Sequence, residues 1–136
     1  MSAIAEQLAP FRGTGSLLPS MLVRFSLPLA LAELELPDTA EVIDLDDPLA
    51  LDREGLRPSQ VATRRRTATQ IQAAEIHAAH AEAIAIRWWS TLEASWINWT
   101  LFDRGAAQIK VIELVELSLS DPRVQEAADF LGLFAR

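Results

Sequence analysis

A stretch without proline or glycine, from Ser59 to Arg104, is the feature that most constrains the fold of this chain. Pro58 stands before it, where proline suits the first turn of a helix, and Gly105 follows it, where a left-handed glycine commonly ends one. Alanine, glutamine, glutamate, isoleucine and arginine fill the interior, and helices tolerate or favour all of them. The stretch therefore predicts one long helix over about residues 59–104, roughly 65 Å long at about 1.5 Å per residue.

A helix of this length exceeds the width of a globule of 136 residues. We therefore expect that it either breaks near residues 87–90 or projects and packs against other chains. Side chains spaced alternately by three and four form one stripe, which is rich in alanine at first, aromatic later and interrupted by the polar Ser95. Its apolar members are Ile71, Ala74, Ala78, Ala81, Ala85, Trp88, Leu92, Trp99 and Phe102. Such a stripe is typical of a helix that packs against a partner helix.

All four tryptophans of the chain fall between Trp88 and Trp99. On a helix, Trp88, Trp96 and Trp99 share one broad side, whereas Trp89 lies about 100° away from Trp88. Tryptophan is common in bulky cores and in the hot spots of protein contacts. We interpret the shared side as core and Trp89 as a partner-binding residue. An interfacial membrane helix is a third interpretation, which the few nearby basic residues support poorly.

The C-terminal residues predict two shorter helices. Over residues 106–119, Lys110, Glu113 and Glu116 recur every three residues among apolar neighbours, as in a helix that is buried on most sides. A β-branched strand is the alternative, and the sequence leaves both open. A last helix is expected to begin at Asp121 and Pro122, and Gly132 can end it.

Before residue 58 the pattern changes to period two. Residues 1–20 predict an arm or loop with a short helix that Pro10 stops, and residues 21–57 predict a small antiparallel β region. The alternating residues are Val23, Phe25 and Leu27, then Leu34 and Leu36. Val42, Ile43 and Leu45, which stand among acids, predict a third short strand. The predicted fold class is therefore α+β and mostly α, in a single domain over residues 1–136 with a helical region from residue 58.

Charges are segregated along the chain. Residues 33–54 hold nine acids and one arginine, and within them Asp44, Asp46 and Asp47 form an acidic loop. Arg64, Arg65 and Arg66 follow near the start of the predicted helix, where cations oppose the helix dipole. A partner should offset these cations: the acidic segment of the same or another chain, a partner protein, or phosphates. We predict that these six residues bind a partner, while the net charge of −7 argues against nucleic acid.

No pattern typical of catalysis is present. His77 and His80 share a helix face, but the intervening sequence lacks the glutamate of zinc peptidases. The acidic loop has Pro48 and Leu49 where a calcium loop needs an oxygen ligand and a glycine. The chain also contains no cysteine and no phosphate-binding glycine motif. We predict no enzyme, no cofactor and no small-molecule substrate, and leave open whether His77 and His80 bind a metal.

The most apolar long window, residues 83–102, contains Arg87, Glu93 and Asn98, so we expect no membrane span. The first residues lack the basic start of a signal peptide, which favours a cytoplasmic or virion location. Taken with the long helix and its stripe, these features predict a non-enzymatic structural or assembly subunit of a larger oligomer, for example a phage head–tail or tail component. The alternative is a small helical binding or regulatory module that recognises one protein partner through the acidic loop and tryptophans.

Overall fold

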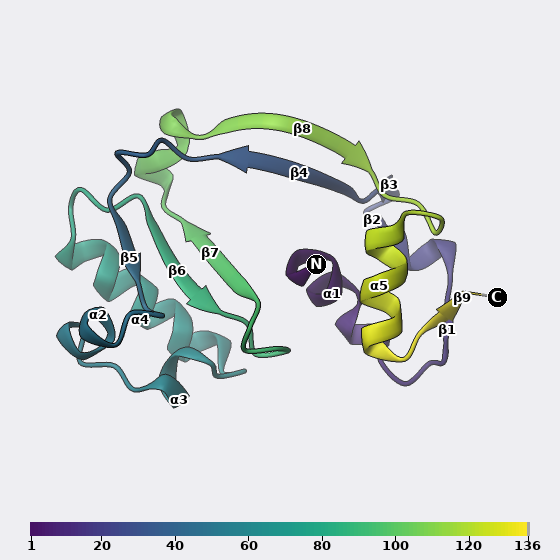
Figure 1. The fold of residues 1–136 in the computed structure, drawn as a ribbon, viewed down its shortest axis with the longest axis horizontal. Coiled ribbons are helices and arrows are strands. Elements are labelled where there is room, and N and C mark those ends of the chain that lie inside the picture. Colours follow the sequence, from purple (N-terminus) through teal and green to yellow (C-terminus); the bar gives the residue numbers. More distant parts are fainter. Residues whose placement is uncertain (136) are drawn as a thin grey trace. The chain divides into compact units, whose positions relative to one another are not determined.

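The computed structural model describes residues 1–135, whose contacts form two compact units (Figure 1). Unit 1 combines Met1–Glu35 with the C-terminal stretch from Lys110, and unit 2 comprises Leu36–Ile109. Helices, with 3₁₀ turns included, make up 40% of the chain and strands 25%, so the prediction of a mostly α protein is wrong. The single domain expected over residues 1–136 stays a prediction, since two such units can also be parts of one domain.

Unit 2 is built on a three-stranded sheet of order β5-β6-β7. β5 (Val42–Asp44) runs parallel to β6 (Ala85–Trp89), and β6 pairs antiparallel with β7 (Ile97–Leu101). Parallel neighbours need a long crossover, usually helical. Here the crossover holds three helices: α2 (Pro48–Arg53), α3 (Pro58–Val61) and α4 (Arg66–Ala79). After β7 comes the 3₁₀ helix η3 (Asp103–Gln108).

The core of unit 2 lies between α4 and this sheet. Ile76 of α4 belongs to one buried cluster with Leu45, Ile86 and Phe102. Residues 83–86 are each no more than 3% exposed, which fits a central strand with a neighbour on both sides. Burial of such a run, at about 25 cal/mol per Å² of apolar surface, is the main term that stabilises the unit.

The single helix predicted over residues 59–104 is therefore wrong, because α4 ends at Ala79 and the chain continues as β6 and β7. Ile84, Ile86 and Trp88 alternate with period two, and isoleucine and tryptophan favour strands. The predicted stripe thus combines one helix with two strands. Gly105 is no left-handed cap either. It lies in η3, where a Cβ would stand 2.7 Å from the Cβ of Ile84, so its role is to allow close approach.

Side chains stabilise the turn between β6 and β7, which contains no proline or glycine. Ser90 Oγ accepts a hydrogen bond of 3.1 Å from the Leu92 N–H, and Glu93 accepts two of 3.1 Å from the N–H and hydroxyl of Ser95. The bonds from Ser95, the backbone one first, lower the pKa of Glu93. Ser90 N–H donates to the Trp96 carbonyl at 2.7 Å. Serine and glutamate side chains thus stabilise this turn in place of proline and glycine. This explains why the absence of proline and glycine from residues 59–104 did not mean one continuous helix.

Unit 1 contains two packed helices, α1 (Ser2–Leu8) and α5 (Pro122–Leu131). Their facing side chains are buried, and the short helix expected before Pro10 is confirmed. The predicted helix at Asp121 is also confirmed: the Asp121 carboxylate accepts from the Arg123 N–H at 2.9 Å, and Gly132 ends α5 with φ of 71°. The smaller elements of unit 1 are η1 (Ala9–Phe11), β1 (Ser16–Leu17), η2 (Pro19–Leu22) and β9 (Phe134–Ala135), with β1 parallel to β9.

Two antiparallel strand pairs complete unit 1. β4 (Ala30–Glu35) pairs with β8 (Lys110–Glu116), and we call this pair the ribbon. β2 (Val23–Arg24) pairs with β3 (Leu27–Pro28), and we call this pair the hairpin. The helix predicted over residues 106–119 is therefore wrong and its strand alternative is confirmed. The self-contained antiparallel β region of residues 21–57 is also wrong, because β4 pairs with the distant β8 and β5 runs parallel to β6.

Candidate functional site

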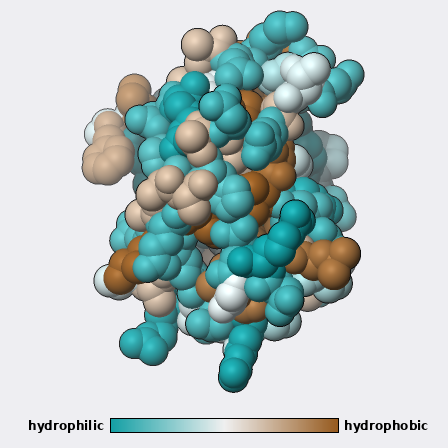
Figure 2. All heavy atoms as spheres, turned by 90° about the vertical axis from the view of Figure 1, so that its left-hand side faces the viewer, coloured by the Kyte–Doolittle hydropathy of each residue, from teal (hydrophilic) through white to brown (hydrophobic). Residues whose placement is uncertain are grey.

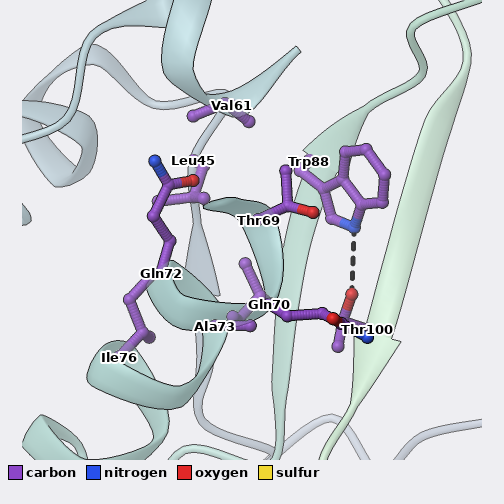
Figure 3. Close-up of a pocket in the computed structure, with 10 residues that line it drawn as sticks. Leu45, Val61, Thr69, Gln70, Gln72, Ala73, Ile76, Trp88 and Thr100 are labelled. Atoms are coloured by element: carbon purple, nitrogen blue, oxygen red, sulfur yellow. Dashed lines mark hydrogen bonds between the residues drawn. The ribbon is translucent and has the colours of Figure 1, made fainter. Parts of the chain in front are cut away.

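A pocket of about 160 Å³ lies between α4 and the sheet of unit 2 (Figure 3). Its lining comes from α3 and α4, from β6 and β7, and from the residue after β5. The lining residues are Leu45, Val61, Thr69, Gln70, Gln72, Ala73, Ile76, Ile86, Trp88 and Thr100. Of the lining residues, Ile76 and Ile86 are buried, whereas Gln70 is exposed. The pocket therefore has a mainly apolar lining to which threonine and glutamine side chains also contribute.

The chemistry of this pocket favours one neutral, apolar group. None of its ten lining residues is charged. The Trp88 indole is held in place because its Nε1–H donates to Thr100 Oγ1 at 3.1 Å. Cofactor and drug pockets usually measure about 300–1,000 Å³, whereas a cavity of about 150 Å³ holds a benzene ring. The hollow thus matches a single ring or a branched aliphatic side chain.

The hairpin of unit 1 presents a fully exposed aromatic ring. Phe25 is 99% exposed, and it occupies the two-residue turn with Ser26. Both residues have positive φ, 51° and 64°. Asparagine and glycine are the residues that favour such turns, and a bulky side chain there is strained. The alternation of Val23, Phe25 and Leu27 predicted a strand through Phe25, and no residue type in the Phe25–Ser26 pair signals the turn.

The ribbon is amphipathic and its apolar face is exposed. Directly paired residues of an antiparallel ladder share a face. The pairs Ala32–Leu114 and Leu34–Val111 therefore lie on one face, and Leu114 and Val111 are 68% and 64% exposed. Ala30 and Glu116 pair at the end of the same face, which is therefore apolar along most of its length. An isolated two-stranded ribbon is marginally stable. An apolar face of this kind is a surface that a further protein can cover.

The other face of the ribbon carries two charged pairs beside the half-buried pair Leu31–Val115. Glu33 lies directly opposite Glu113, and Glu35 lies opposite Lys110 with 3.6 Å between carboxylate and ammonium. Like charges directly opposite each other destabilise a strand pair. Arg123 is close enough to Glu113 for the glutamate to raise the arginine pKa, after the larger effect of the hydrogen bond to Asp121. Glu113 therefore has a cation nearby.

Unit 2 offers a different surface. Figure 2 looks onto the side of the molecule where α2, α4 and β5 are drawn in Figure 1, and hydrophilic atoms predominate there, with apolar atoms in separate patches. The exposed large apolar side chains of this unit are Leu49, Ile71 and Trp99, which come from three different elements or loops. Most exposed apolar side chains of the described chain lie in unit 1 instead.

The predicted acidic residues divide into two roles. Arg87 Nη1 donates to Asp44 at 2.8 Å and to Asp46 at 3.2 Å, and the bond to Asp44 is the main cause of the raised pKa of Arg87. Asp47 caps α2 by accepting from the N–H of Leu49 at 3.1 Å. These carboxylates thus have partners within unit 2, and sequence reasoning missed Arg87 as that partner.

Trp89 shares a hollow of about 320 Å³ with Asp46, between the chain near α2 and the β6–β7 turn. The structure thus brings together two of the predicted partner-binding residues. Trp89 is half-buried and packs against the core cluster. Trp99, which was expected on the core side of a helix, is 47% exposed. Whether Trp89 binds a partner stays a prediction.

The predicted arginines lie elsewhere, at the start of α4. Arg64, Arg65 and Arg66 are all exposed, and within residues 1–135 none forms an ion pair. Arg65 is the N-cap of α4 and offers no capping side-chain bond. No acidic side chain of the described residues therefore pairs with these three arginines. That they bind a partner stays a prediction.

The two histidines stand at the end of α4 and face different groups. His80 Nε2 lies 2.8 Å from Glu54 Oε1, while the Nε–H of Arg104 donates to His77 Nε2 at 3.2 Å. The Arg104 guanidinium also donates to the carbonyls of His77 and His80, at 2.6 and 2.9 Å, and so satisfies groups that a helix end leaves unpaired. In the part of the chain described, no group of three or more histidine, cysteine or acidic residues could hold a metal ion.

Over the same residues, no helix combines the length and the hydropathy that a bilayer span requires. Comparison of the chain with protein-family models, with curated proteins and with solved structures finds no match. Function must therefore be argued from the pocket, the hairpin and the ribbon themselves.

Proposed function

We propose that this protein is a non-enzymatic assembly subunit that associates with further copies of itself through the exposed apolar residues of unit 1. One observation carries the proposal: seven large apolar side chains are exposed on the hairpin and ribbon, namely Val23, Phe25, Leu27, Leu34, Val111, Ile112 and Leu114. Exposed apolar surface of this extent typically marks a site of protein interaction.

Two further features support the proposal. The outer edges of β4 and β8 have no strand neighbour within residues 1–135, and free edges are templates for pairing. A ribbon with an open apolar face also gains stability when a second protein covers it. A phage head–tail or tail component is the narrower form of this proposal, and detection of the protein in purified particles is its test.

A module that binds one protein partner is the second candidate, although it is less helical than the small helical module first expected. It is favoured by the hollow that Trp89 and Asp46 share and by the uncompensated arginines at α4. Triple substitution of Arg64, Arg65 and Arg66 by serine would abolish capture of such a partner, whereas it would leave self-association unchanged.

Sedimentation velocity over a wide concentration range tests the main proposal. We expect the mass of the wild-type protein to rise with concentration, and Leu114→Lys to weaken this association because it places a charge on the apolar face. Ile71→Lys is the matched control, since Ile71 is 55% exposed on α4 of unit 2. A wild-type protein that stays monomeric throughout contradicts the proposal, as does association of Leu114→Lys that equals the wild type.

A further inference from the structure

We propose that Phe25 of one copy inserts into the pocket between α4 and the sheet of another copy. The inference rests on the proposed function, because it names the surface that receives the exposed hairpin. It joins two features that are otherwise unexplained: a phenyl ring that is 99% exposed, and an apolar hollow of about 160 Å³ with an open mouth.

Size and polarity agree between ring and pocket. A cavity of about 150 Å³ takes up a benzene ring, and the phenyl group of Phe25 is a single ring of that kind. The lining of the pocket carries no charge, which suits a neutral side chain. The fixed indole of Trp88 offers an aromatic neighbour, and aromatic pairs favour edge-to-face or offset contacts.

The backbone at Phe25 gives a second reason. A φ of 51° at phenylalanine is strained, and asparagine or glycine would relieve it at no cost to the turn. Strained residues persist where they serve a purpose, often in binding. The turn holds the ring away from the hairpin at its tip, where it is ready to enter a hollow on another molecule.

Charge indicates how the hairpin is oriented. Arg24 precedes Phe25, and residues 7–32 contain no acid. The pocket is flanked on its Leu45 side by Asp44 and Asp46, and on its Val61 side by the arginines that begin α4. The Arg24 guanidinium donates to the carbonyls of Val23 and Gln7 at 3.2 and 3.3 Å and keeps its positive charge beside Phe25. This charge matches the Leu45 side, where the two carboxylates exceed the single charge of Arg87.

The geometry of assembly follows from the separate positions of ring and pocket. Phe25 belongs to unit 1 and the pocket to unit 2, so the contact joins two different patches. A contact between different patches is heterologous. It produces a closed cyclic oligomer or an open chain of subunits, in contrast to a two-fold dimer.

Mixing of two complementary variants tests the inference. Phe25→Asn removes the ring and keeps the pocket, whereas Ala73→Leu fills the pocket and keeps the ring. We expect each variant alone to associate more than tenfold more weakly than the wild type. We expect their mixture to form a one-to-one complex by sedimentation, because one ring and one pocket remain. Ser26→Gly keeps the ring, Ala74→Leu adds the same bulk at an exposed position of α4, and both should assemble like the wild type.

The outcomes separate this inference from the proposed function. If the wild type associates but Ala73→Leu does so equally well, the assembly function stands and the pocket contact is overturned. The same holds if the mixture forms no complex although both variants are folded by circular dichroism. If Ala73→Leu fails to fold, Ala73→Val replaces it in the same mixture. A monomeric wild type overturns both proposals.

Discussion

The β6–β7 pair and the ribbon are both antiparallel pairs of strands, yet they differ in what covers them. β6 has neighbours on both edges and α4 on one face, and its Ile86 is 3% exposed. β8 has one neighbour, and Val111 and Leu114 keep most of their surface in solvent. Both pairs contain β-branched or aromatic residues that favour strands. Strand propensity thus accounts for the formation of both pairs. Whether the apolar side of a pair stabilises the fold depends on whether another element covers it, as α4 covers β6, or leaves it in solvent, as at β8.

The largest expected effect is a direct contrast between the two pairs. Ile86→Ala removes buried methylene groups from the core of unit 2 and should lower the free energy of unfolding by about 2–5 kcal/mol. Leu114→Ala removes exposed groups and should change it by less than about 0.5 kcal/mol at monomeric concentration. Urea unfolding followed by tryptophan fluorescence and circular dichroism measures both. Equal losses would show that the ribbon is covered within the monomer.

A second prediction concerns the close approach at the end of β7. Gly105→Ala places a methyl group 2.7 Å from Ile84 Cβ, so the backbone must shift. Overpacking of this kind should lower the free energy of unfolding by about 1–3 kcal/mol. Ala106→Ser, at the exposed next position, is the control and should change little. If Gly105→Ala unfolds at the same urea concentration as the wild type, the contact between η3 and Ile84 is looser than described.

A smaller effect of opposite sign is expected at the hairpin. Phe25→Asn relieves a strained φ and should raise the free energy of unfolding of the monomer by about 1 kcal/mol. The same substitution removes the ring that assembly uses. Thermal melts at low concentration measure the first effect and sedimentation the second. A loss of monomer stability would mean that the Phe25 side chain contributes to the fold of its own chain.

The pH dependence of unit 1 gives the subtlest test. The hydrogen bond from Arg123 lowers the pKa of Asp121 to about 2. Because the folded pKa lies below the ordinary value of 3.8, Asp121 contributes stability above that value, and the contribution is lost as pH falls towards 2. Asp121→Asn should therefore flatten the stability curve over this interval and leave its shape above pH 5 unchanged. A curve that stays equally steep in the variant would assign the acid dependence to other carboxylates.

Local signals predicted part of this fold correctly. Asp121, Pro122 and Gly132 mark both ends of α5, because caps and turn residues act over one helical turn. The alternation around Leu34 predicted β4, because alternation of apolar and polar residues is also a local signal. By contrast, β4 pairs with a strand that begins at Lys110, and no local pattern encodes a pairing over that distance.

The remaining errors share a physical cause. An alanine-rich helix precedes Ile84, and its composition masked the change to period two that begins there. The turn at Phe25 depends on positive φ at residues that rarely adopt it. The alternation of Val23, Phe25 and Leu27 therefore predicted one continuous strand across the turn. The pocket was out of reach of sequence reasoning because its lining comes from five separate stretches of chain, from Leu45 to Thr100. The acidic loop was recognised, but its partner Arg87 is more than forty residues away.

Hydroxyl-radical footprinting of the wild-type protein, diluted and concentrated, tests the central claim most directly. The account predicts that oxidation of Phe25, Val111 and Leu114 falls several-fold on concentration, while oxidation of Ile71 stays constant. Protection of the ring and ribbon would show that unit 1 forms the assembly contact. Oxidation of all four residues that is independent of concentration would contradict it, as would protection confined to Ile71.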